Sequence, residues 1–388
     1  MIDKIKEFQG LNITFNTGEA CNLKCKYCYE VNKKPTTLSL EDAKKFIDLI
    51  ISDPDPVGAI GTKDEWILKS GIVLDFIGGD SLMYPKLVDD IVSYFIFQAH
   101  LHNYHAKDRW RMSISTNGTL FSNPDVRKFC EKYANNLSLG VSIDGCPEIH
   151  DMNRVYNDGR GSMNDILEWW GWYRTYFGDS STKATANKQS IPYLFKSLKF
   201  MYEELGITQI MHNFIMEDME LEQSDLDELD HQFALCVDYV LEHKNDLYWS
   251  MIDKMTFAEA KSFTENCEES PNRGKCGSGN MPALSPNGKI YPCFRFLPHT
   301  LEVKSDYSVG SLQEGFNRKE NFKFIRDQTR EKLSSDKCKE CEIESACPYC
   351  LAGGISEKGY PYRTTYGCEI TKLQVKWARE YWRRYDSI

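Results

Sequence analysis

The segment EACNLKCKYCYE (residues 19–30) places Cys21, Cys25 and Cys28 in the spacing CxxxCxxC. Three thiols so close together fit neither a disulfide nor a two-cysteine redox motif, because either would leave one thiol over. A zinc site would need a fourth protein ligand, and the segment contains no other His or Cys. Thiolates normally hold all four irons of a [4Fe–4S] cluster. Three cysteines would hold three of these irons and leave the fourth open to another ligand.

Composition limits the classes of protein to which the chain can belong. Its 388 residues, 41% of them hydrophobic, are enough for about two or three domains with sizeable cores. A net charge of −10 argues against a general nucleic-acid or anionic-membrane binder, which needs clustered basic residues. We see neither a signal peptide nor the run of about 18 apolar residues that a spanning helix requires. We therefore expect a cytoplasmic protein, in which a total of 14 cysteines indicates metal sites rather than disulfides.

Strand-like and helix-like runs alternate along the first part of the chain. The pattern predicts strands at 11–15, 71–79, 111–118, 137–145, 182–187 and 207–216. The first helix should begin at a capping pattern formed by Ser39 and Asp42. Six βα units imply a parallel sheet with crossover helices, so we expect an α/β fold with a partial (β/α)6 TIM-like barrel. Its functional loops should follow the strand ends, and CxxxCxxC follows the first strand.

From Cys267 onward the chain is rich in Cys, Gly and Pro, which is typical of a small metal-organised domain. It ends in an amphipathic helix, TKLQVKWAREYWRRY (371–385). We expect a core at 1–235, a bridging helical segment at 236–265 and the small domain at 266–388. Eight cysteines lie in this last part: Cys267, Cys276, Cys293, Cys338, Cys341, Cys347, Cys350 and Cys368. Eight thiols suit two fully ligated clusters, with a zinc-ribbon-like domain as the alternative.

The chain resembles the radical S-adenosylmethionine (SAM) enzymes, on CxxxCxxC after the first strand, IGGD at 77–80 and VSIDGCPEIHDMNR at 141–154. The resemblance implies that Cys21, Cys25 and Cys28 hold a [4Fe–4S] cluster whose open iron binds SAM. It also implies a set of SAM-binding residues on the neighbouring strand ends: Tyr27, Gly78, Gly79, Asp80, Asn117, Ser142, Asp144 and Arg154.

Each of these SAM-binding residues has an implied role. Gly78 and Gly79 would present backbone to the methionine amino group, although Asp80 stands where these enzymes usually have Glu. Ser142 and Asp144 would hold the ribose hydroxyls. Tyr27 would pack on the ligand, Asn117 ends the third strand, and Arg154 would pair with the methionine carboxylate.

The C-terminal cysteines resemble the SPASM extension of radical SAM enzymes, which carries two auxiliary [4Fe–4S] clusters. The run CKECEIESACPYC (338–350) departs from the usual pattern, because its last spacing is CxxC rather than CxxxC. The resemblance implies one auxiliary cluster on Cys267, Cys276, Cys293 and Cys350, and another on Cys338, Cys341, Cys347 and Cys368. We interpret Cys130, Cys146 and Cys236 as packing residues, and His150 and His212 as structural.

The resemblance implies a reaction in which a reduced cluster cleaves SAM to methionine and a 5′-deoxyadenosyl radical, which then abstracts hydrogen from the substrate. SPASM proteins most often modify peptides or proteins, so we expect a peptide maturase that forms a thioether or carbon–carbon cross-link or performs another oxidation. The expected partners are a ribosomal peptide or protein substrate and a low-potential electron donor such as flavodoxin or ferredoxin. A separate leader-binding protein is a further expected partner if substrate recognition requires one.

Several alternatives stay open. The segment 141–154 resembles anaerobic sulfatase-maturing enzymes, which form formylglycine, but Phe294 stands where that subfamily has an Asp base after the cysteine. A small-molecule radical SAM dehydrogenase is another alternative. Outside this class remain an iron–sulfur electron carrier without a SAM pocket and a zinc-organised interaction module.

Overall fold

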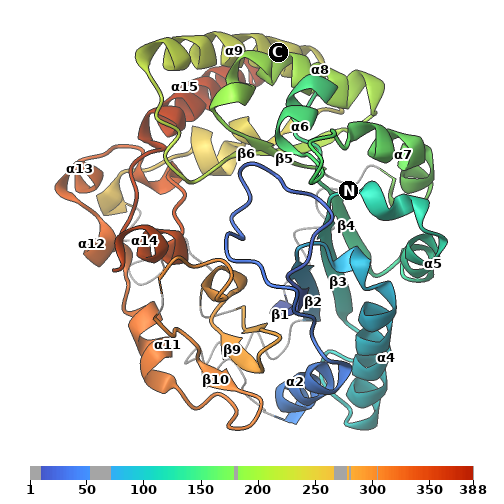
Figure 1. Ribbon diagram of the computed structural model, residues 1–388. Helices are drawn as coiled ribbons and strands as arrows, with labels where there is room; N and C mark the ends of the chain where they lie inside the picture. Colours follow the sequence, from blue (N-terminus) through green and yellow to red (C-terminus); the bar gives the residue numbers. More distant parts are fainter. Residues whose placement is uncertain are drawn as a thin grey trace.

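The computed structural model describes residues 10–52, 71–178, 182–265, 278, 281–303 and 305–387 (Figure 1). The barrel strands are β1 (Gly10–Gly18), β2 (Gly71–Gly78), β3 (Trp110–Thr116), β4 (Leu137–Val141), β5 (Thr182–Ala186) and β6 (Gln209–Phe214). The helices that accompany them are α2 (Leu40–Ser52), α4 (Pro85–Leu101), α5 (Pro124–Lys132), α6 (Pro147–Asn153), α7 (Met163–Phe177), α8 (Leu194–Lys199) and α9 (Gln223–Glu242).

The remaining part of the chain contains shorter elements and one long helix. Its strands are β7 (Tyr248–Trp249), β8 (Ala283–Leu284), β9 (Lys289–Tyr291) and β10 (Gly310–Ser311). Its helices are α11 (Lys319–Arg326), α12 (Arg330–Leu333), α13 (Asp336–Lys339), α14 (Leu351–Lys358) and α15 (Cys368–Tyr385). The expected C-terminal amphipathic helix is thus present.

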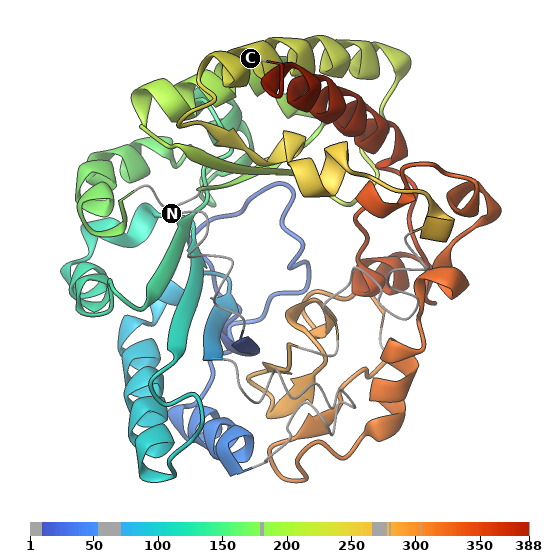
Figure 2. The same ribbon diagram turned by 180° about the vertical axis from the view of Figure 1, so that it is seen from behind.

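The strands form two sheets, ordered β10-β9-β8-β1-β2-β3-β4 and β5-β6-β7. All neighbours from β1 to β4, and β5 with β6, are parallel, and a bridge between Ser142 and Lys183 connects the two sheets. The expected α/β architecture with a partial barrel is therefore confirmed. The parallel pairing of β8 with β1, through Thr14 and Phe15, was not expected. It joins the C-terminal region to the barrel sheet, as the rear view shows (Figure 2).

Local sequence explains why these elements form. The Ser39 hydroxyl accepts a hydrogen bond of 3.0 Å from the Asp42 amide, which satisfies one free donor at the start of α2. The next turns bury Phe46 and Ile47 completely against the sheet. In the strands, residues of one face, such as Phe15 and Phe76, are fully buried and stack at 5.3 Å between ring centroids.

The C-terminal helix α15 packs against the barrel. Helix α15 lies beside α9 in both ribbon views (Figures 1 and 2). The Asp230 carboxylate of α9 accepts hydrogen bonds from Lys376 and from the Trp377 indole, each 2.6 Å long. Asp230, one of the acidic residues of α9, therefore helps to hold α15 against α9. In the described ranges, no helix has the length and apolar character needed to cross a membrane.

Candidate functional site

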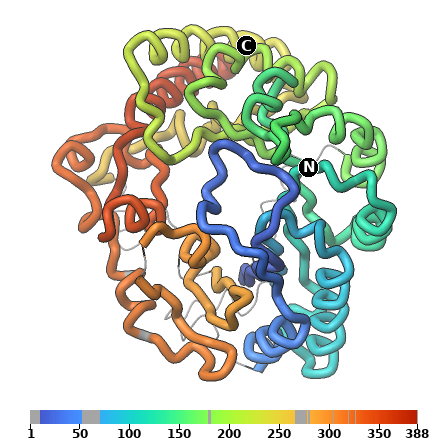
Figure 3. Tube along the Cα trace, viewed as in Figure 1, coloured from blue at the N-terminus to red at the C-terminus, as the bar shows by residue number. Residues whose placement is uncertain are grey.

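The cysteine loop, residues 19–39, runs from the end of β1 to α2 and lies in the middle of the molecule (Figure 3). The barrel lies on one side of it and the C-terminal region on the other. The loop is tied to the barrel by backbone hydrogen bonds from Lys24 to Val155 (2.7 Å) and from Lys26 to Asn153 (3.0 Å). The three cysteines are thus carried at the strand C-termini, as the sequence predicted from their position after the first strand.

Two glycines let the end of β2 approach this loop closely. The Gly79 amide donates a 2.9 Å hydrogen bond to the Gly18 carbonyl. A Cβ at Gly79 would lie 1.9 Å from the Ala20 carbonyl oxygen, and one at Gly78 would lie 2.1 Å from that of Gly18. Gly78 also has a φ of +132°, which side chains rarely adopt. The glycine turn is therefore required by space as well as by backbone conformation.

Asp80 and Asn117 hold neighbouring strand ends in place. The buried Asp80 carboxylate accepts hydrogen bonds from the Leu82 amide (3.0 Å), the Thr116 hydroxyl (2.9 Å) and the Asn117 amide (2.8 Å). Burial raises the pKa of Asp80, an effect that these donors oppose. The Asn117 side-chain amide in turn donates to Asn22 Oδ1 at 2.8 Å, next to Cys21. In this structure, the Asp80 side chain organises the strand ends through contacts within the protein.

Tyr27, Asp144 and Arg154 form a buried group around Cys25. The Tyr27 hydroxyl donates to the Asp144 carboxylate, which also accepts from the Thr185 amide at 3.1 Å. Arg154 Nε lies 3.0 Å from the same carboxylate, and its guanidinium lies 5.5 Å from the centre of the Tyr27 ring. Burial lowers the pKa of Arg154, but the Asp144 carboxylate outweighs this effect and raises the pKa above its usual value. The structure thus brings together three of the residues that the resemblance implies for SAM.

A hydrogen-bonded chain behind this group fixes the segment that carries it. The Asp144 amide donates to His150 Nδ1 at 3.4 Å, so Nε2 carries the proton that His150 shares with Ser162 Oγ at 3.0 Å. Ser162 then donates to the Arg154 carbonyl at 2.8 Å. Burial and then the charge of Arg154 lower the pKa of His150 to about 3, so the ring is neutral. The structural role expected for His150 agrees with these contacts.

Ser142 lies on the same face, at the junction of the two sheets. Its amide donates a 2.9 Å hydrogen bond to the Thr116 carbonyl, at the end of β3. Its side chain is largely buried, next to the segment that leads to Asp144. The SAM-binding roles of Ser142 and of the other strand-end residues stay predictions.

The surroundings of the three thiols fit an iron–sulfur cluster. Burial raises the pKa of Cys21 to about 11 and also raises that of Cys25, so each thiolate needs compensating positive charge. Arg154 Nη1 lies 4.0 Å from Cys25 Sγ. Burial disfavours the charge of Lys33, but Cys28 and Glu30 outweigh it and raise the pKa of Lys33 to about 12. Cluster irons would supply the remaining charge, and Cys21, Cys25 and Cys28 would hold them.

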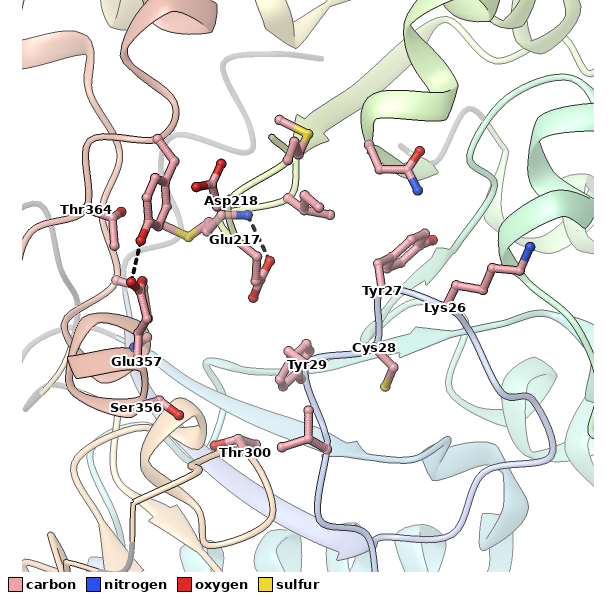
Figure 4. Close-up of a pocket in the computed structure, with 18 of the residues that line it drawn as sticks. Lys26, Tyr27, Cys28, Tyr29, Glu217, Asp218, Thr300, Ser356, Glu357 and Thr364 are labelled. Carbon is pink, nitrogen blue, oxygen red and sulfur yellow. Dashed lines mark hydrogen bonds between the residues drawn. The ribbon is translucent and has the colours of Figure 1, made fainter. Parts of the chain in front are cut away.

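A cavity of about 820 Å³ opens above the cysteine loop. Its walls come from residues 26–31 of the loop, from residues 215–220 after β6, and from residues 295–302 and 350–366 of the C-terminal region. Figure 4 shows Tyr27, Cys28 and Tyr29 on one side, with Ser356 and Glu357 on the opposite side. The cavity therefore has barrel residues and C-terminal residues on facing walls.

Arg295 and Glu217 are cavity residues that sequence reasoning missed. The Arg295 guanidinium lies 4.4 Å from the centre of the Tyr29 ring and 3.7 Å from the Glu217 carboxylate. The adjacent Phe294 lies 6.2 Å from Tyr29, ring centre to ring centre. No periodic pattern relates these positions, so only their convergence on one cavity identifies them. The presence of Phe294 after Cys293 was the nearest signal in the sequence.

One set of C-terminal cysteines interacts electrostatically in the structure. Burial raises the pKa of Cys347 to about 11, and the nearby Cys368 and Cys341 thiols add to this shift. Cys368 in turn interacts electrostatically with Cys338 and Cys341. Beside them, the buried Glu344 carboxylate pairs with Arg330 (2.7 Å) and Arg363. The assignment of these four cysteines as ligands of the second auxiliary cluster stays a prediction.

Of the four cysteines implied for the first auxiliary cluster, Cys293 and Cys350 lie within the described residues. Cys293 and Cys350 both border a second hydrophobic cluster that includes Phe296 and Ile355. Cys350 also lines the cavity and accepts a 3.3 Å hydrogen bond from the Gly353 amide at the start of α14. Cys267 and Cys276 lie outside the described residues. Among the described residues, no three His, Cys, Asp or Glu side chains are grouped so that they could bind one metal ion.

The three thiols that the sequence assigns to packing behave accordingly. Cys130, Cys146 and Cys236 are completely buried in the barrel. Cys236 lies in α9 within the main hydrophobic core, where burial raises its pKa well above the usual value. Such thiols act as small apolar side chains.

Comparison with known proteins extends these observations. Residues 15–185 match the family model of the radical SAM superfamily. The serine-type anaerobic sulfatase-maturating enzyme of Bacteroides thetaiotaomicron is 24% identical over 357 residues, which cover 85% of this chain and 79% of that enzyme. An uncharacterised protein of Methanocaldococcus jannaschii is 26% identical over 201 residues, which cover 52% of this chain and 60% of that protein.

Two solved structures share the fold over most of the chain. Native anSMEcpe with bound AdoMet and the Kp18Cys peptide matches with a TM-score of 0.71 at 16% identity, covering 98% of this chain and 100% of that one. Streptococcus suis SuiB bound to its precursor peptide SuiA matches with a TM-score of 0.57 at 16% identity, covering 94% of this chain and 78% of that one. Together with the family match, these findings support a radical SAM maturase of the SPASM type. Residues 15–185 therefore match a radical SAM domain, as the motifs predicted.

Proposed function

We propose that this radical SAM enzyme is a peptide maturase, which forms a thioether or carbon–carbon cross-link in a ribosomal peptide or protein or oxidises it in a related way. The observation that carries the proposal is the cavity of about 820 Å³ with Cys28 on one wall and Cys350 on another. A substrate held there lies between the cluster loop and a thiol implied for an auxiliary cluster. The peptides bound in the anSMEcpe and SuiB structures support a substrate of this class.

The cofactors that we propose are SAM and three [4Fe–4S] clusters. When bound, the loop cluster and SAM would supply a one-electron reductant and a radical able to take hydrogen from an unactivated carbon. Cys21, Cys25 and Cys28 would hold that cluster, while the Gly78–Gly79 backbone and Arg154 would orient the methionine end of SAM. Ser142 and Asp144 would orient its ribose, and Tyr27 would shield it from water.

The auxiliary clusters would be held by the C-terminal cysteines in the two sets named above. Electrons released by substrate oxidation would leave through them to an external acceptor, and a low-potential donor such as flavodoxin or ferredoxin would reduce the loop cluster. For the domains we propose a core at 1–235, a bridging segment at 236–265 and a SPASM domain at 266–388. We propose a cytoplasmic location, where glutathione and thioredoxin keep such thiols reduced.

Sulfatase maturation is the second candidate, favoured by the sequence match to a sulfatase-maturating enzyme. In its subfamily an Asp base is expected directly after the cysteine, and Phe294 occupies that position here. The Phe294 ring lies 6.2 Å from the Tyr29 ring, centre to centre, and it offers no proton acceptor. We therefore rank formylglycine formation below peptide cross-linking or oxidation.

The test is anaerobic reconstitution of the full chain with iron, sulfide, SAM and a strong reductant, with 5′-deoxyadenosine as the readout. Replacing Cys21, Cys25 and Cys28 together by Ala should abolish its formation. The matched control replaces the packing residues Cys130 and Cys236, and it should keep SAM cleavage within about twofold. A triple variant that still forms 5′-deoxyadenosine would refute the mechanism.

Mass spectrometry identifies the substrate class. Candidate peptides encoded next to the gene are incubated with the enzyme, and a loss of two hydrogens per event indicates a cross-link or oxidation. Replacing Cys338 by Ala should abolish this mass change while SAM cleavage continues in part. If SAM is cleaved but no peptide changes mass, the small-molecule dehydrogenase is favoured instead.

A further inference from the structure

His299 is a buried histidine placed between two buried glutamates. Its side chain is 1% exposed, with Nδ1 3.6 Å from the Glu19 carboxylate and Nε2 3.6 Å from the Glu30 carboxylate. Within the described part of the chain, neither ring nitrogen makes a hydrogen bond. Each nitrogen thus faces one carboxylate at ion-pair distance, from opposite sides of the ring.

The two glutamates are the first and last residues of the segment EACNLKCKYCYE. Glu19 precedes Cys21 by two positions, and Glu30 follows Cys28 by two. Glu19 also accepts a 2.8 Å hydrogen bond from the Lys34 amide, and Glu30 lies 3.3 Å from the Lys33 ammonium. His299 therefore contacts both ends of the segment 19–30, which carries the three cysteines.

Backbone contacts hold the histidine segment against the same loop. The Asn32 amide donates to the His299 carbonyl at 3.1 Å, and its side chain donates to the Leu301 carbonyl at 3.0 Å. Two neighbours of the histidine, Thr300 and Glu302, line the cavity. One short segment thus contacts the cysteine loop with one side chain and the cavity with the next.

Physical chemistry gives the ring a role in loop position. Buried carboxylates are unfavourable unless they are paired or hydrogen-bonded. The imidazole of His299 places one ring nitrogen beside each carboxylate, so a single side chain contacts both glutamates. Without the ring, Glu19 and Glu30 would each lose a buried polar neighbour, and a cavity would remain between the segment 19–30 and the C-terminal region.

We infer that His299 is a positioning residue, a latch that holds both ends of the segment 19–30 against the C-terminal wall of the cavity. Through Glu19 and Glu30 it keeps the cluster-binding thiols in a constant position relative to the substrate. The latch rests on the proposed function, because it positions the loop for SAM cleavage. None of the three latch residues binds a cluster or SAM in our assignment.

The test compares His299→Ala and His299→Gln with His212→Ala, using the reconstituted full chain. His212 is a matched control, since it is also buried and makes no hydrogen bond through its ring within the described residues, yet has no carboxylate beside it. The readouts are iron content, the change in the EPR spectrum of the reduced cluster on adding SAM, and the rate of 5′-deoxyadenosine formation. If His299 were purely structural, its replacement would change the free energy of unfolding and none of these readouts.

We expect His299→Ala to form 5′-deoxyadenosine at least tenfold more slowly at equal iron content and to change the SAM-dependent EPR signal. His299→Gln, which keeps a donor for one glutamate, should recover part of the rate, and His212→Ala should match wild type in both readouts. Wild-type EPR and rate in His299→Ala would overturn the latch.

A second variant covers the case in which His299→Ala does not fold. Glu30→Gln keeps the shape of the side chain and removes one carboxylate of the latch, and we expect the same EPR change with a smaller loss of rate. An unchanged EPR signal in that variant would overturn the latch as well. A wild-type enzyme that forms no 5′-deoxyadenosine would instead refute the proposed function.

Discussion

Replacement of Gly79 by Ala tests whether the glycine turn after β2 seats the cysteine loop. The added Cβ would lie 1.9 Å from the Ala20 carbonyl oxygen, 2.3 Å from the Ala20 carbonyl carbon and 2.7 Å from the Cys21 nitrogen. All three are backbone atoms, so no side-chain rotation relieves the overlap. The loop has to move, and Cys21 moves with it.

The size of the effect follows from this geometry. Overpacking that shifts the backbone costs about 1–3 kcal/mol, and an overlap with three backbone atoms belongs at the upper end of that range. At about 3 kcal/mol, with 1.36 kcal/mol for each factor of ten, the correctly seated loop becomes on the order of 100 times less populated. We expect 5′-deoxyadenosine formation to fall by a similar factor.

The assay measures the initial rate of 5′-deoxyadenosine formation in anaerobically reconstituted enzyme, normalised to iron content. Gly171→Ala is the control, because a Cβ there meets nothing within 4 Å. It lies in α7, where Ala is favoured over Gly by about 1 kcal/mol, so its stability should rise or stay equal. A Gly79→Ala enzyme with the wild-type rate would refute the steric reasoning.

Two further predictions concern buried charge. Arg154→Gln leaves the Asp144 carboxylate, 1% exposed, without its cation. It should lower the free energy of unfolding in urea by about 3–5 kcal/mol, and a loss under about 1 kcal/mol would contradict the pairing. Burial lowers the pKa of His150 to about 3 and that of His212 to about 4, so below about pH 6.5 the unfolded state binds protons that the folded state does not. Stability should therefore fall as pH falls, by about 2 kcal/mol per histidine at pH 5. Thermal unfolding at pH 7 and at pH 5 measures this loss. The variant His212→Gln should remove about half of it.

Much of the barrel could be predicted because its signals are local. The alternation of apolar residues in LNITF and the glycines after GIVLDFI are properties of a few consecutive residues. The structure has strands at these positions, β1 and β2, paired in parallel. Ser39 begins a helix because a hydroxyl can satisfy the free amide of Asp42 without any help from distant residues.

Other features could not be predicted, because they depend on how distant segments meet. Strand β8 has two residues and no strand-like pattern of its own, yet it extends the barrel sheet beside β1. The sequence did not predict that the Asp80 carboxylate would accept hydrogen bonds from Thr116 and Asn117. The pairing of Arg295 with Glu217 likewise follows from the path of the chain rather than from any spacing.

The segment EACNLKCKYCYE contains both kinds of information. By itself the sequence determined that three thiols stand together after a strand, because ligand spacing is a local property of the chain. It also contains Glu19 and Glu30, but a glutamate has no preferred partner at any fixed spacing. Only the tertiary structure decided that both face His299, because burial between the barrel and the C-terminal region removes water and leaves that one imidazole between the two carboxylates.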